Sequence, residues 1–303
     1  MQVYDSVNEI IGKTPLVRLK GFGENLYGKC EFLNPSHSIK DRAAYAMIKK
    51  ALDEAHISKE TTIIECTSGN MGISLAMICA TLGLKIILTM PESMSIERRK
   101  MMALFGAKLE LTPAREGMKG AYERALALHK EIKNSFIPSQ FENLANKFAH
   151  RENTAVEILN DLDGKIDYFV AGFGTSGTIS GVGEVLKEKF ADKVKIIAVE
   201  PAASPLLSEG KAGGHKIQGI GANFIPKILN QSVIDEIQTI SNEDAIATAR
   251  ELALKNGLMV GISSGANVFI ASKIAKANPD KIIVTMLNDT AERYLSTDLF
   301  AGI

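Results

Sequence analysis

The sequence predicts an α/β fold in which parallel sheets are covered by helices on both faces. Short runs rich in β-branched residues alternate along the chain with segments of helical apolar spacing. Most of these runs are apolar throughout, which is typical of parallel strands buried on both sides. At 303 residues the chain is long enough for two lobes, although no stretch of distinct composition marks a boundary.

The individual elements follow from local signals. The segment 241–257 is an expected helix that begins at Ser241 as N-cap, has Asp244 three residues later and stops at Gly257. The segment 120–132 has similar helical spacing. The expected strands are 61–66, 85–90, 108–112, 167–172, 195–200 and 281–286.

The most apolar window, 72–90, raises the question of a membrane span. Gly83 and Lys85 divide it into a piece of helix length and a piece of strand length. A buried helix, a turn and a strand therefore explain the window better than a transmembrane helix.

Charge and cysteine content favour a cytoplasmic protein. Lys plus Arg equals Asp plus Glu at 35 each, so no overall charge favours nucleic acid or an anionic membrane as a partner. Three cysteines without a C-x-x-C pair fit a reducing compartment, and the N-terminus has no apparent export signal. We expect neither nucleic acid nor a membrane among its partners.

One glycine-rich loop, GFGTSGTISG, follows the expected strand 167–172 and opens a helix. Its G-x-G-x-x-G spacing at Gly172, Gly174 and Gly177, with Glu200 at the end of the next apolar run, matches a dinucleotide-binding fingerprint. This pattern alone predicts an NAD-dependent oxidoreductase.

The same loop also contains three hydroxyl groups, at Thr175, Ser176 and Thr178. A terminal phosphate dianion exposes three oxygens and benefits from such donors. The hydroxyl content of the loop therefore favours a terminal phosphate as the ligand. The simplest alternative is a turn that only packs a helix on a strand.

Three further loops have the same strand-to-helix or turn-to-helix character, at 34–42 with Lys40, at 67–72 and at 261–265. Ligands of open parallel sheets gather at the carboxyl ends of strands, where helix N-termini offer N–H groups. These loops are therefore candidate binding segments.

Taken together, these loops and other segments resemble the cysteine synthase (O-acetylserine sulfhydrylase) and cystathionine β-synthase family. This is a pyridoxal phosphate (PLP) family of fold type II, which is tryptophan synthase β-like. The segments run in family order over nearly the whole chain: IGKTPLVRL (11–19), NPSHSIKDR (34–42), TSGNMGISLA (67–76), MPESMSIERRK (90–100), GAKLELT (106–112), SQFENLAN (139–146), GFGTSGTISG (172–181), QGIGANFIP (218–226), GISSGAN (261–267) and ERYLST (292–297).

The resemblance implies two lobes, each a mainly parallel twisted sheet covered by helices. Residues 1–11 and 35–144 are expected to form a smaller, mobile substrate-loop domain. Residues 12–34 and 145–303 are expected to form a larger domain that binds the PLP phosphate.

The resemblance also assigns the cofactor site, in which no metal is expected. Lys40 is implied as the catalytic lysine that forms the internal aldimine, and such a lysine has to be deprotonated, which burial favours. Asn70 is implied to meet the ring hydroxyl oxygen, and Ser263 to lie beside the pyridine nitrogen. A serine there only hydrogen-bonds, so the ring can stay neutral. The residues implied to hold the phosphate are Gly174, Thr175, Ser176, Gly177 and Thr178.

Substrate contacts are implied for the loop after the strand 61–66 and for two further positions. Thr67, Ser68 and Gln140 match positions that grip the substrate carboxylate. Helix capping is the plain alternative for the Thr, Ser and Asn residues of this loop. The full predicted substrate set is Thr67, Ser68, Gly69, Met71, Gln140 and Gly219.

The implied reaction is PLP-dependent β-replacement through an aminoacrylate, with O-acetyl-L-serine and sulfide giving L-cysteine and acetate. Three residues depart from the family pattern: Met71 replaces a usual threonine, and Cys66 and Asn288 replace usual prolines. These departures leave the donor open. The same chemistry with L-cysteine as donor would release hydrogen sulfide and form lanthionine or cystathionine.

The family is usually dimeric, so a homodimer is expected, and some members bind the C-terminal tail of serine acetyltransferase. Two other classes stay open at this stage. One is the NAD-dependent oxidoreductase, and the other is a non-catalytic partner protein that keeps the fold.

Overall fold

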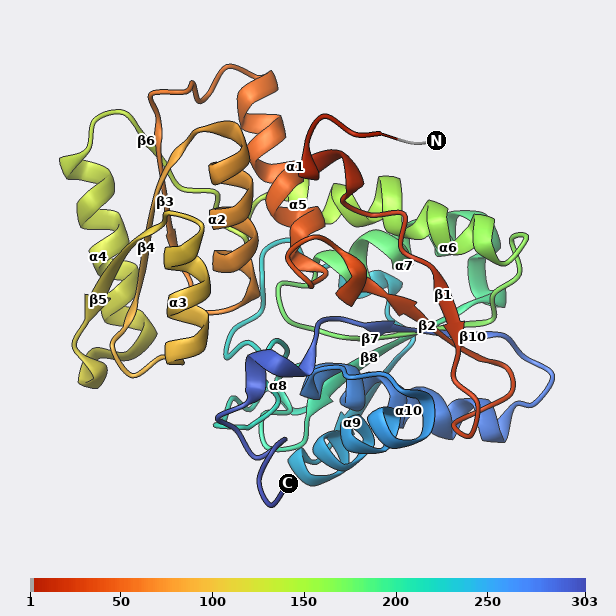
Figure 1. Cartoon of the computed structure of the whole chain (residues 1–303). Helices are drawn as coiled ribbons and strands as arrows, with labels where there is room; N and C mark the ends of the chain where they lie inside the picture. The colour runs from red at the N-terminus through yellow and green to blue at the C-terminus, as the bar shows by residue number, and fades with distance from the viewer. Residues whose placement is uncertain (1–2) are drawn as a thin grey trace. The chain divides into compact units, whose positions relative to one another are not determined.

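The computed structural model describes residues 3–303, which divide into two compact units (Figure 1). Unit 1 contains Lys40–Asn146 together with the N-terminal residues through Ile11, and unit 2 contains Gly12–Ile39 and Lys147–Ile303. Each unit has its own sheet and its own apolar clusters.

Unit 1 is built on a four-stranded parallel sheet in the order β5-β4-β3-β6. Its strands are β3 (Thr62–Cys66), β4 (Lys85–Pro91), β5 (Lys108–Thr112) and β6 (Ser135–Phe136). Its helices are α1 (Lys40–Asp53), α2 (Asn70–Leu82), α3 (Ile96–Leu104) and α4 (Gly117–Glu131), and α5 (Leu144–Ala149) begins in unit 1 and ends in unit 2.

Both faces of this sheet are covered, which explains why its strands are apolar throughout. Ile63 packs with residues of α1, α2 and α3, whereas the next residue, Ile64, packs with Ala125 and Leu128 of α4. Successive side chains of a strand point to opposite faces, so both faces of β3 need apolar residues.

Unit 2 is built on a six-stranded sheet in the order β1-β2-β10-β7-β8-β9, in which β1 pairs antiparallel and the other neighbours pair parallel. Its strands are β1 (Leu16–Arg18), β2 (Leu26–Cys30), β7 (Tyr168–Gly172), β8 (Lys195–Pro201), β9 (Glu236–Ile240) and β10 (Ile283–Leu287). Its helices are α6 (Ala155–Asp161), α7 (Gly177–Phe190), α8 (Leu206–Glu209), α9 (Asn242–Asn256) and α10 (Ile262–Ala277).

Short helical turns complete the described chain. A π-helical turn, η4 (His150–Thr154), joins α5 to α6. The 3₁₀ turns are η1 (Val7–Ile10), η2 (Glu31–Leu33), η3 (Ala114–Glu116), η5 (Ala191–Lys193), η6 (Gln231–Val233) and η7 (Ala291–Tyr294).

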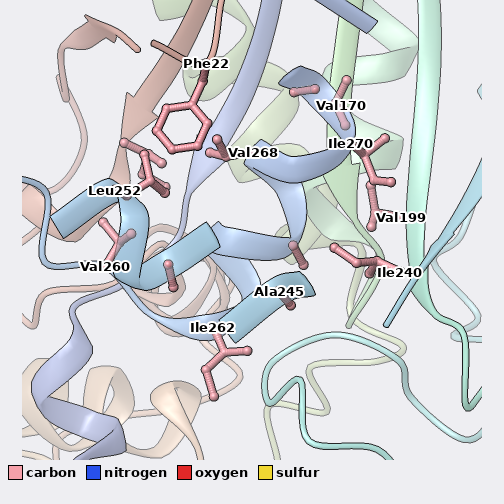
Figure 2. Packing of buried hydrophobic residues seen from close by; sticks show 14 of the residues in the cluster. Phe22, Val170, Val199, Ile240, Ala245, Leu252, Val260, Ile262, Val268 and Ile270 are labelled. Atoms are coloured by element: carbon pink, nitrogen blue, oxygen red, sulfur yellow. The ribbon is translucent and has the colours of Figure 1, made fainter. Parts of the chain in front are cut away.

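The sheet of unit 2 also carries helices on both faces. Val170 and Val199 face α9 and α10 in an apolar cluster that reaches Ile262 at the start of α10 (Figure 2). Phe169 and Ala171 of the same β7 strand belong to the opposite cluster, with residues of α6 and α7. This packing fixes the starts of α7 and α10 against one sheet.

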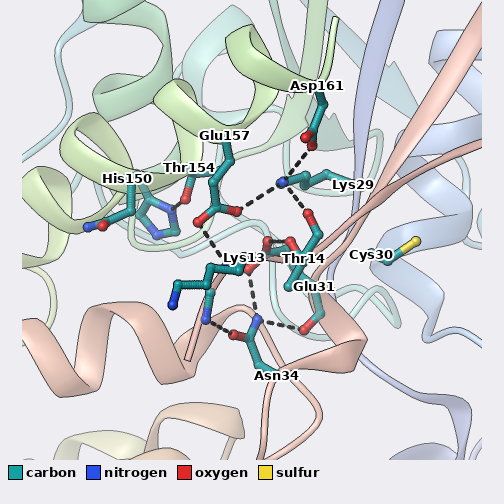
Figure 3. A network of polar contacts seen from close by, with 12 residues as sticks. Lys13, Thr14, Lys29, Cys30, Glu31, Asn34, His150, Thr154, Glu157 and Asp161 are labelled. Carbon is teal, nitrogen blue, oxygen red and sulfur yellow. Dashed lines mark hydrogen bonds and ion pairs between the residues drawn. The ribbon is translucent and has the colours of Figure 1, made fainter. Parts of the chain in front are cut away.

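A buried lysine anchors the first strands of unit 2 to α6 (Figure 3). Lys29 is fully buried, and its ammonium lies 2.9 Å from Glu157 and 3.3 Å from Asp161 while also donating to the carbonyl oxygen of Thr14. Burial of a charge is tolerated when opposite charges and hydrogen bonds compensate it, as they do here.

The same network continues to the segment that leads toward Lys40. Thr14 Oγ1 donates to Glu31 Oε1 at 2.6 Å, and Asn34 Nδ2 donates to Glu31 Oε2 at 2.9 Å (Figure 3). Asn34 Oδ1 in turn accepts from the Gly12 N–H at 2.8 Å. The start of the 34–42 segment is therefore held by buried polar contacts.

The predicted α/β class with parallel sheets is confirmed, and each of the six expected strands is present within one or two residues. Ser241 accepts from the Asp244 N–H at 3.0 Å, and Gly257 ends α9 with a φ of 66°. The window 72–90 forms α2, a left-handed turn at Gly83 and β4, as expected. None of the helices within residues 3–303 is long and apolar enough to cross a membrane.

Candidate active site

In unit 1, the loop Thr67–Gly69 connects the carboxyl end of β3 to the start of α2. The Thr67 N–H donates to Thr89 O at 3.1 Å, and Thr67 Oγ1 accepts from the Gly69 N–H at 3.3 Å. Gly69 is the N-cap of α2 and has no side chain with which to cap it. Thr67 thus orders the loop, while the first N–H groups of α2 receive no N-cap side chain.

Gln140 follows β6, the parallel neighbour of β3, and a buried carboxyl fixes its loop. Glu65 Oε2 accepts from the Ser139 N–H at 3.0 Å. Desolvation raises the pKa of Glu65 to about 7, while hydrogen bonds from the N–H groups of Ser139, Cys66 and Gln140 act in the opposite direction. Glu65 therefore joins the Gln140 loop to the strand that ends at the Thr67 loop.

Lys40 is the first residue of α1 and is half-buried. Its neighbour Asp41 is fully buried and accepts from Ser74 Oγ at 2.6 Å. Ser74 lies one turn after Asn70 in α2, so this bond joins the starts of α1 and α2. Unit 1 thereby gathers the predicted residues Lys40, Thr67, Ser68, Gly69, Asn70, Met71 and Gln140.

Two departures from the family pattern border this loop. The Met71 side chain is buried and belongs to the apolar cluster of α1, α2 and α3. Burial raises the pKa of the half-buried Cys66 thiol to about 11, which keeps the thiol protonated near neutral pH. The Met71 side chain has no hydroxyl, whereas the usual threonine would have one at this position.

In unit 2, the predicted phosphate loop connects β7 to α7. Ser176 has a φ of 72°, in the left-handed region that residues other than glycine seldom adopt. Its side chain is buried, and its Oγ has no hydrogen-bond partner in the part of the chain that the structure describes. Gly177, the next residue, begins the 14-residue helix α7.

A buried hydroxyl without a partner is costly unless a ligand satisfies it. Here it lies beside the N–H groups at a helix start, where the helix dipole favours an anion. The cradle formed by Gly174–Thr178 is therefore suited to a phosphate group, and this fits the phosphate of PLP.

Gly174 and Gly219 bring this cradle close to the start of α10. A Cβ built on Gly174 would meet the Gly219 carbonyl oxygen at 2.4 Å, so only glycine fits there. A Cβ built on Gly219 would lie 3.7 Å from Ser263 Oγ. Unit 2 therefore gathers its predicted residues, which are Gly174, Thr175, Ser176, Gly177, Thr178, Gly219 and Ser263.

Ser263 is the second residue of α10 and is buried, and Gly261 is the N-cap of this helix. Neither Ser263 nor Ser264 therefore occupies the N-cap position of α10. Asn288, just after β10, donates from Nδ2 to Ser263 Oγ at 3.0 Å and from its backbone N–H to Ser264 Oγ at 2.8 Å.

Two buried residues that the sequence did not point to support the cradle. His150 Nε2 lies 3.3 Å from Thr178 Oγ1, and its Nδ1 lies 3.0 Å from Thr154 Oγ1. Asn267 Oδ1 accepts from the Gly172 N–H at 2.8 Å, and its Nδ2 donates to Met286 O at 3.0 Å. A lone histidine and a helical asparagine give no local signal, although GISSGAN ends at Asn267.

Glu200, which the dinucleotide interpretation requires for a ribose, has another role. It is fully buried, and it accepts from the N–H groups of Leu207 at 2.8 Å and Ser208 at 3.0 Å and from the Ser208 hydroxyl. Its carboxylate caps the short helix α8. Both of its oxygens are thus already bonded within the protein.

Comparison with known proteins agrees with this geometry. The family model for pyridoxal-phosphate dependent enzymes matches residues 7–289. The chain is 70% identical to cysteine synthase B of Campylobacter jejuni over 301 residues, which cover 99% of this chain and 100% of that relative.

Two solved structures are similar over nearly the full chain. An O-ureido-L-serine synthase superposes with a TM-score of 0.96 at 42% identity, covering 100% of this chain and 96% of that chain. A hydrogen sulfide-producing enzyme from Fusobacterium nucleatum superposes with a TM-score of 0.92 at 44% identity, covering 97% of this chain and 100% of that chain. The resemblance found in the sequence is confirmed. The chain belongs to the pyridoxal-phosphate dependent enzymes, as the family match and these identities show.

Proposed function

We propose that the protein is a cysteine synthase that converts O-acetyl-L-serine and sulfide to L-cysteine and acetate. The observation that supports the PLP site most directly is the buried Ser176 hydroxyl at the start of α7, which has no hydrogen-bond partner among residues 3–303. The 70% identity to cysteine synthase B of Campylobacter jejuni supports the substrate pair.

The residues present fit each part of PLP. The cradle Gly174–Thr178 offers hydroxyl and N–H donors for the phosphate. Ser263 provides a hydroxyl for the pyridine nitrogen, and Asn70 an amide for the ring hydroxyl oxygen. Lys40 is the amine that we propose bonds to the cofactor.

PLP, when bound, withdraws electrons from the α-carbon of an attached amino acid and so lowers the barrier to removal of its α-proton. Lys40 takes this proton at its Nζ as general base and later returns it. The β-substituent leaves with its bonding electron pair, and the sulfur nucleophile adds at the β-carbon.

The substrate carboxylate is held, in this proposal, by the Thr67–Asn70 loop and by Gln140. N–H groups at the start of α2 provide donors and a partial positive charge for an anion. Because Glu65 fixes the backbone of the Gln140 loop, it positions this half of the carboxylate site.

A second candidate is the same chemistry with L-cysteine as donor, which releases hydrogen sulfide. The replacement of threonine by the buried Met71 and the similarity to a hydrogen sulfide-producing enzyme of Fusobacterium nucleatum favour it. With a second cysteine or homocysteine as acceptor, the product would be lanthionine or cystathionine.

Comparison of the two donors tests the proposal. The purified holoenzyme is assayed for cysteine formation from O-acetylserine and sulfide, and for sulfide release from cysteine. We expect a higher kcat/KM with O-acetylserine. A higher value with cysteine would establish the second candidate instead.

Lys40→Ala and Lys49→Ala form the matched pair for the base. Lys49 lies on the same helix, is exposed and forms an ion pair with Asp53 at 2.6 Å. We expect Lys40→Ala to abolish both reactions and Lys49→Ala to retain them, because exposed ion pairs contribute little. Equal activity in the two variants would contradict the role of Lys40.

We further propose that the protein is a cytoplasmic homodimer. The free thiols of Cys30, Cys66 and Cys79 support the compartment, and the usual dimeric state of the family supports the dimer. Binding of a serine acetyltransferase C-terminal tail is part of this proposal, and so is the division into a substrate-loop domain and a phosphate-binding domain. Sedimentation of the holoenzyme with and without such a tail peptide tests the assembly.

A further inference from the structure

We propose that Asn288 is a positioning residue that sets the direction of the hydrogen bond from Ser263 to the cofactor's ring nitrogen. The inference rests on PLP binding as proposed above. It concerns a position at which the family usually has proline and at which this chain has an amide.

The geometry places Asn288 directly against the first turn of α10. Its Nδ2 donates to Ser263 Oγ at 3.0 Å, and its backbone N–H donates to Ser264 Oγ at 2.8 Å. The next residue, Asp289, accepts the N–H of Gly261, the N-cap, at 3.0 Å. Residues 288–289 therefore contact this helix start through three hydrogen bonds.

The bond from Asn288 Nδ2 determines whether the Ser263 hydroxyl can still donate a hydrogen bond. A hydroxyl has one hydrogen and two lone pairs. Because Asn288 Nδ2 occupies a lone pair, the hydrogen of Ser263 stays available for donation. A hydroxyl that accepts one hydrogen bond also becomes a stronger donor of the next.

The space next to this hydroxyl is kept open by glycine. A Cβ on Gly219 would lie 3.7 Å from Ser263 Oγ, and Gly219 has a φ of 96°, a left-handed conformation that favours glycine. Ser263 itself is only 2% exposed, so its hydroxyl has little access to bulk water. A flat ring that enters this space meets a hydroxyl already oriented as a donor.

The consequence is an unprotonated ring nitrogen. A nitrogen that accepts a hydrogen bond from Ser263 carries no proton of its own, and the ring is then a weaker electron sink. This favours loss of a β-substituent over transamination. Proline at position 288 provides neither the backbone N–H nor the side-chain amide, so this chain has added two donors.

Nitrogen-15 NMR of the holoenzyme loaded with ring-labelled PLP tests the proposal. We expect the wild-type ring nitrogen to resonate as an unprotonated pyridine that accepts a hydrogen bond. Asn288→Asp keeps the size and the backbone N–H but only accepts, so it takes the Ser263 hydrogen and moves the resonance toward the protonated form. Asn288→Ala should raise the PLP dissociation constant by about 3- to 10-fold through the lost bond.

Ser264→Ala is the control, because it removes the partner of the Asn288 backbone N–H and keeps the amide on Ser263. We expect it to lower the thermal midpoint without moving the ring-nitrogen resonance. A protonated nitrogen in the wild type, or an unchanged resonance in Asn288→Asp, would overturn the inference. A protein that binds no PLP would instead overturn the proposed function, so the two failures are distinguishable.

Discussion

Met71 is the residue at which the sequence departs most visibly from its family, because it replaces a threonine in the proposed carboxylate loop. Its side chain is 2% exposed and packs in the apolar cluster of α1, α2 and α3. The replacement of threonine by methionine therefore removes a hydroxyl donor from the proposed carboxylate loop and adds a side chain to the apolar core.

Met71→Thr and Met77→Thr separate these two effects. Met77 lies in the same helix and cluster and is 3% exposed. Both variants should lower the free energy of unfolding by about 1–3 kcal/mol, because each removes buried volume and buries a hydroxyl. Only Met71→Thr should also lower the KM of the amino-acid substrate, by roughly 10-fold, through a new donor to the carboxylate.

Urea unfolding and steady-state kinetics of the two purified variants give both quantities. If the two variants change KM alike, position 71 has no particular relation to substrate.

Glu65 predicts a pH dependence of stability. Desolvation raises its pKa from 4.5 to about 7 in the folded protein. A carboxyl with a raised folded pKa stabilises fully below its unfolded pKa, and this stability is lost as pH rises through the folded pKa. Relative to Glu65→Gln, the wild-type free energy of unfolding should therefore fall by about 3 kcal/mol between pH 4.5 and about pH 7.

Urea titrations of both proteins across this range measure the difference directly. Parallel curves for wild type and Glu65→Gln would show that the carboxyl titrates alike in the folded and unfolded states.

At the scale of residues, the sequence predicted the site residues that belong to contiguous motifs, but it did not predict those that only tertiary packing brings to the site. Lys40 and the 174–178 loop stand in contiguous motifs. His150 and Glu65 are single residues whose partners, Thr178 and Ser139, lie 28 and 74 positions away along the chain. Such contacts leave no local pattern, although a charged residue inside the apolar run 61–66 is a usable sign for Glu65.

At the scale of elements, the turn from β7 into α7 depends on a close backbone approach. Gly174→Ala would place its Cβ 2.4 Å from the Gly219 carbonyl oxygen, so the loop has to shift. We expect PLP affinity to fall by at least about 10-fold as cradle hydrogen bonds are lost.

Gly214→Ala is the matched control, because no heavy atom of the described chain beyond its two chain neighbours lies within 4 Å of its Cβ position and its φ is outside the left-handed region. Titration of the apo-proteins with PLP, followed by absorbance, compares the two. Wild-type affinity in Gly174→Ala would show that this approach is not needed for the cradle.

The anchoring of β2 to α6 predicts a large difference between two lysines. Lys29→Met leaves Glu157 and Asp161 without their buried partner and should lower the free energy of unfolding by about 3–5 kcal/mol. Lys281→Met removes a pair with Asp167 in which the lysine is 52% exposed, and it should cost at most about 1 kcal/mol.

Chemical denaturation of these two variants measures both values. A similar loss in both would mean that the buried network in Figure 3 contributes no more than a surface pair.

Element prediction succeeded for the strands that are buried on both faces and for the edge strand β5, and it missed β1, β2, β6 and β9. The continuous apolar runs gave β3, β4, β7, β8 and β10. β6 has two residues and β1 three, too few to show a period, and β9 is a half-exposed edge strand with the polar residues Glu236 and Gln238. β2 was hidden by Lys29, because a charged residue argues against a buried strand unless its partners are known.

At the scale of the whole molecule, the boundary between the two lobes could not be predicted from amino-acid composition. Each unit contains segments from separate parts of the chain, which only long-range contacts define. The predicted site residues divide accordingly, with Lys40 and the Thr67 loop in unit 1 and the cradle and Ser263 in unit 2. The proposal therefore assigns PLP-binding residues to each of the two units.

Borohydride reduction of the purified holoenzyme, followed by peptide mass mapping, tests the proposed role of Lys40 most directly. Reduction fixes PLP to the lysine that binds it. We predict one labelled peptide with the adduct on Lys40, and no label on the fully buried Lys29. A label on any other lysine, or no label at all, would contradict the proposed active site.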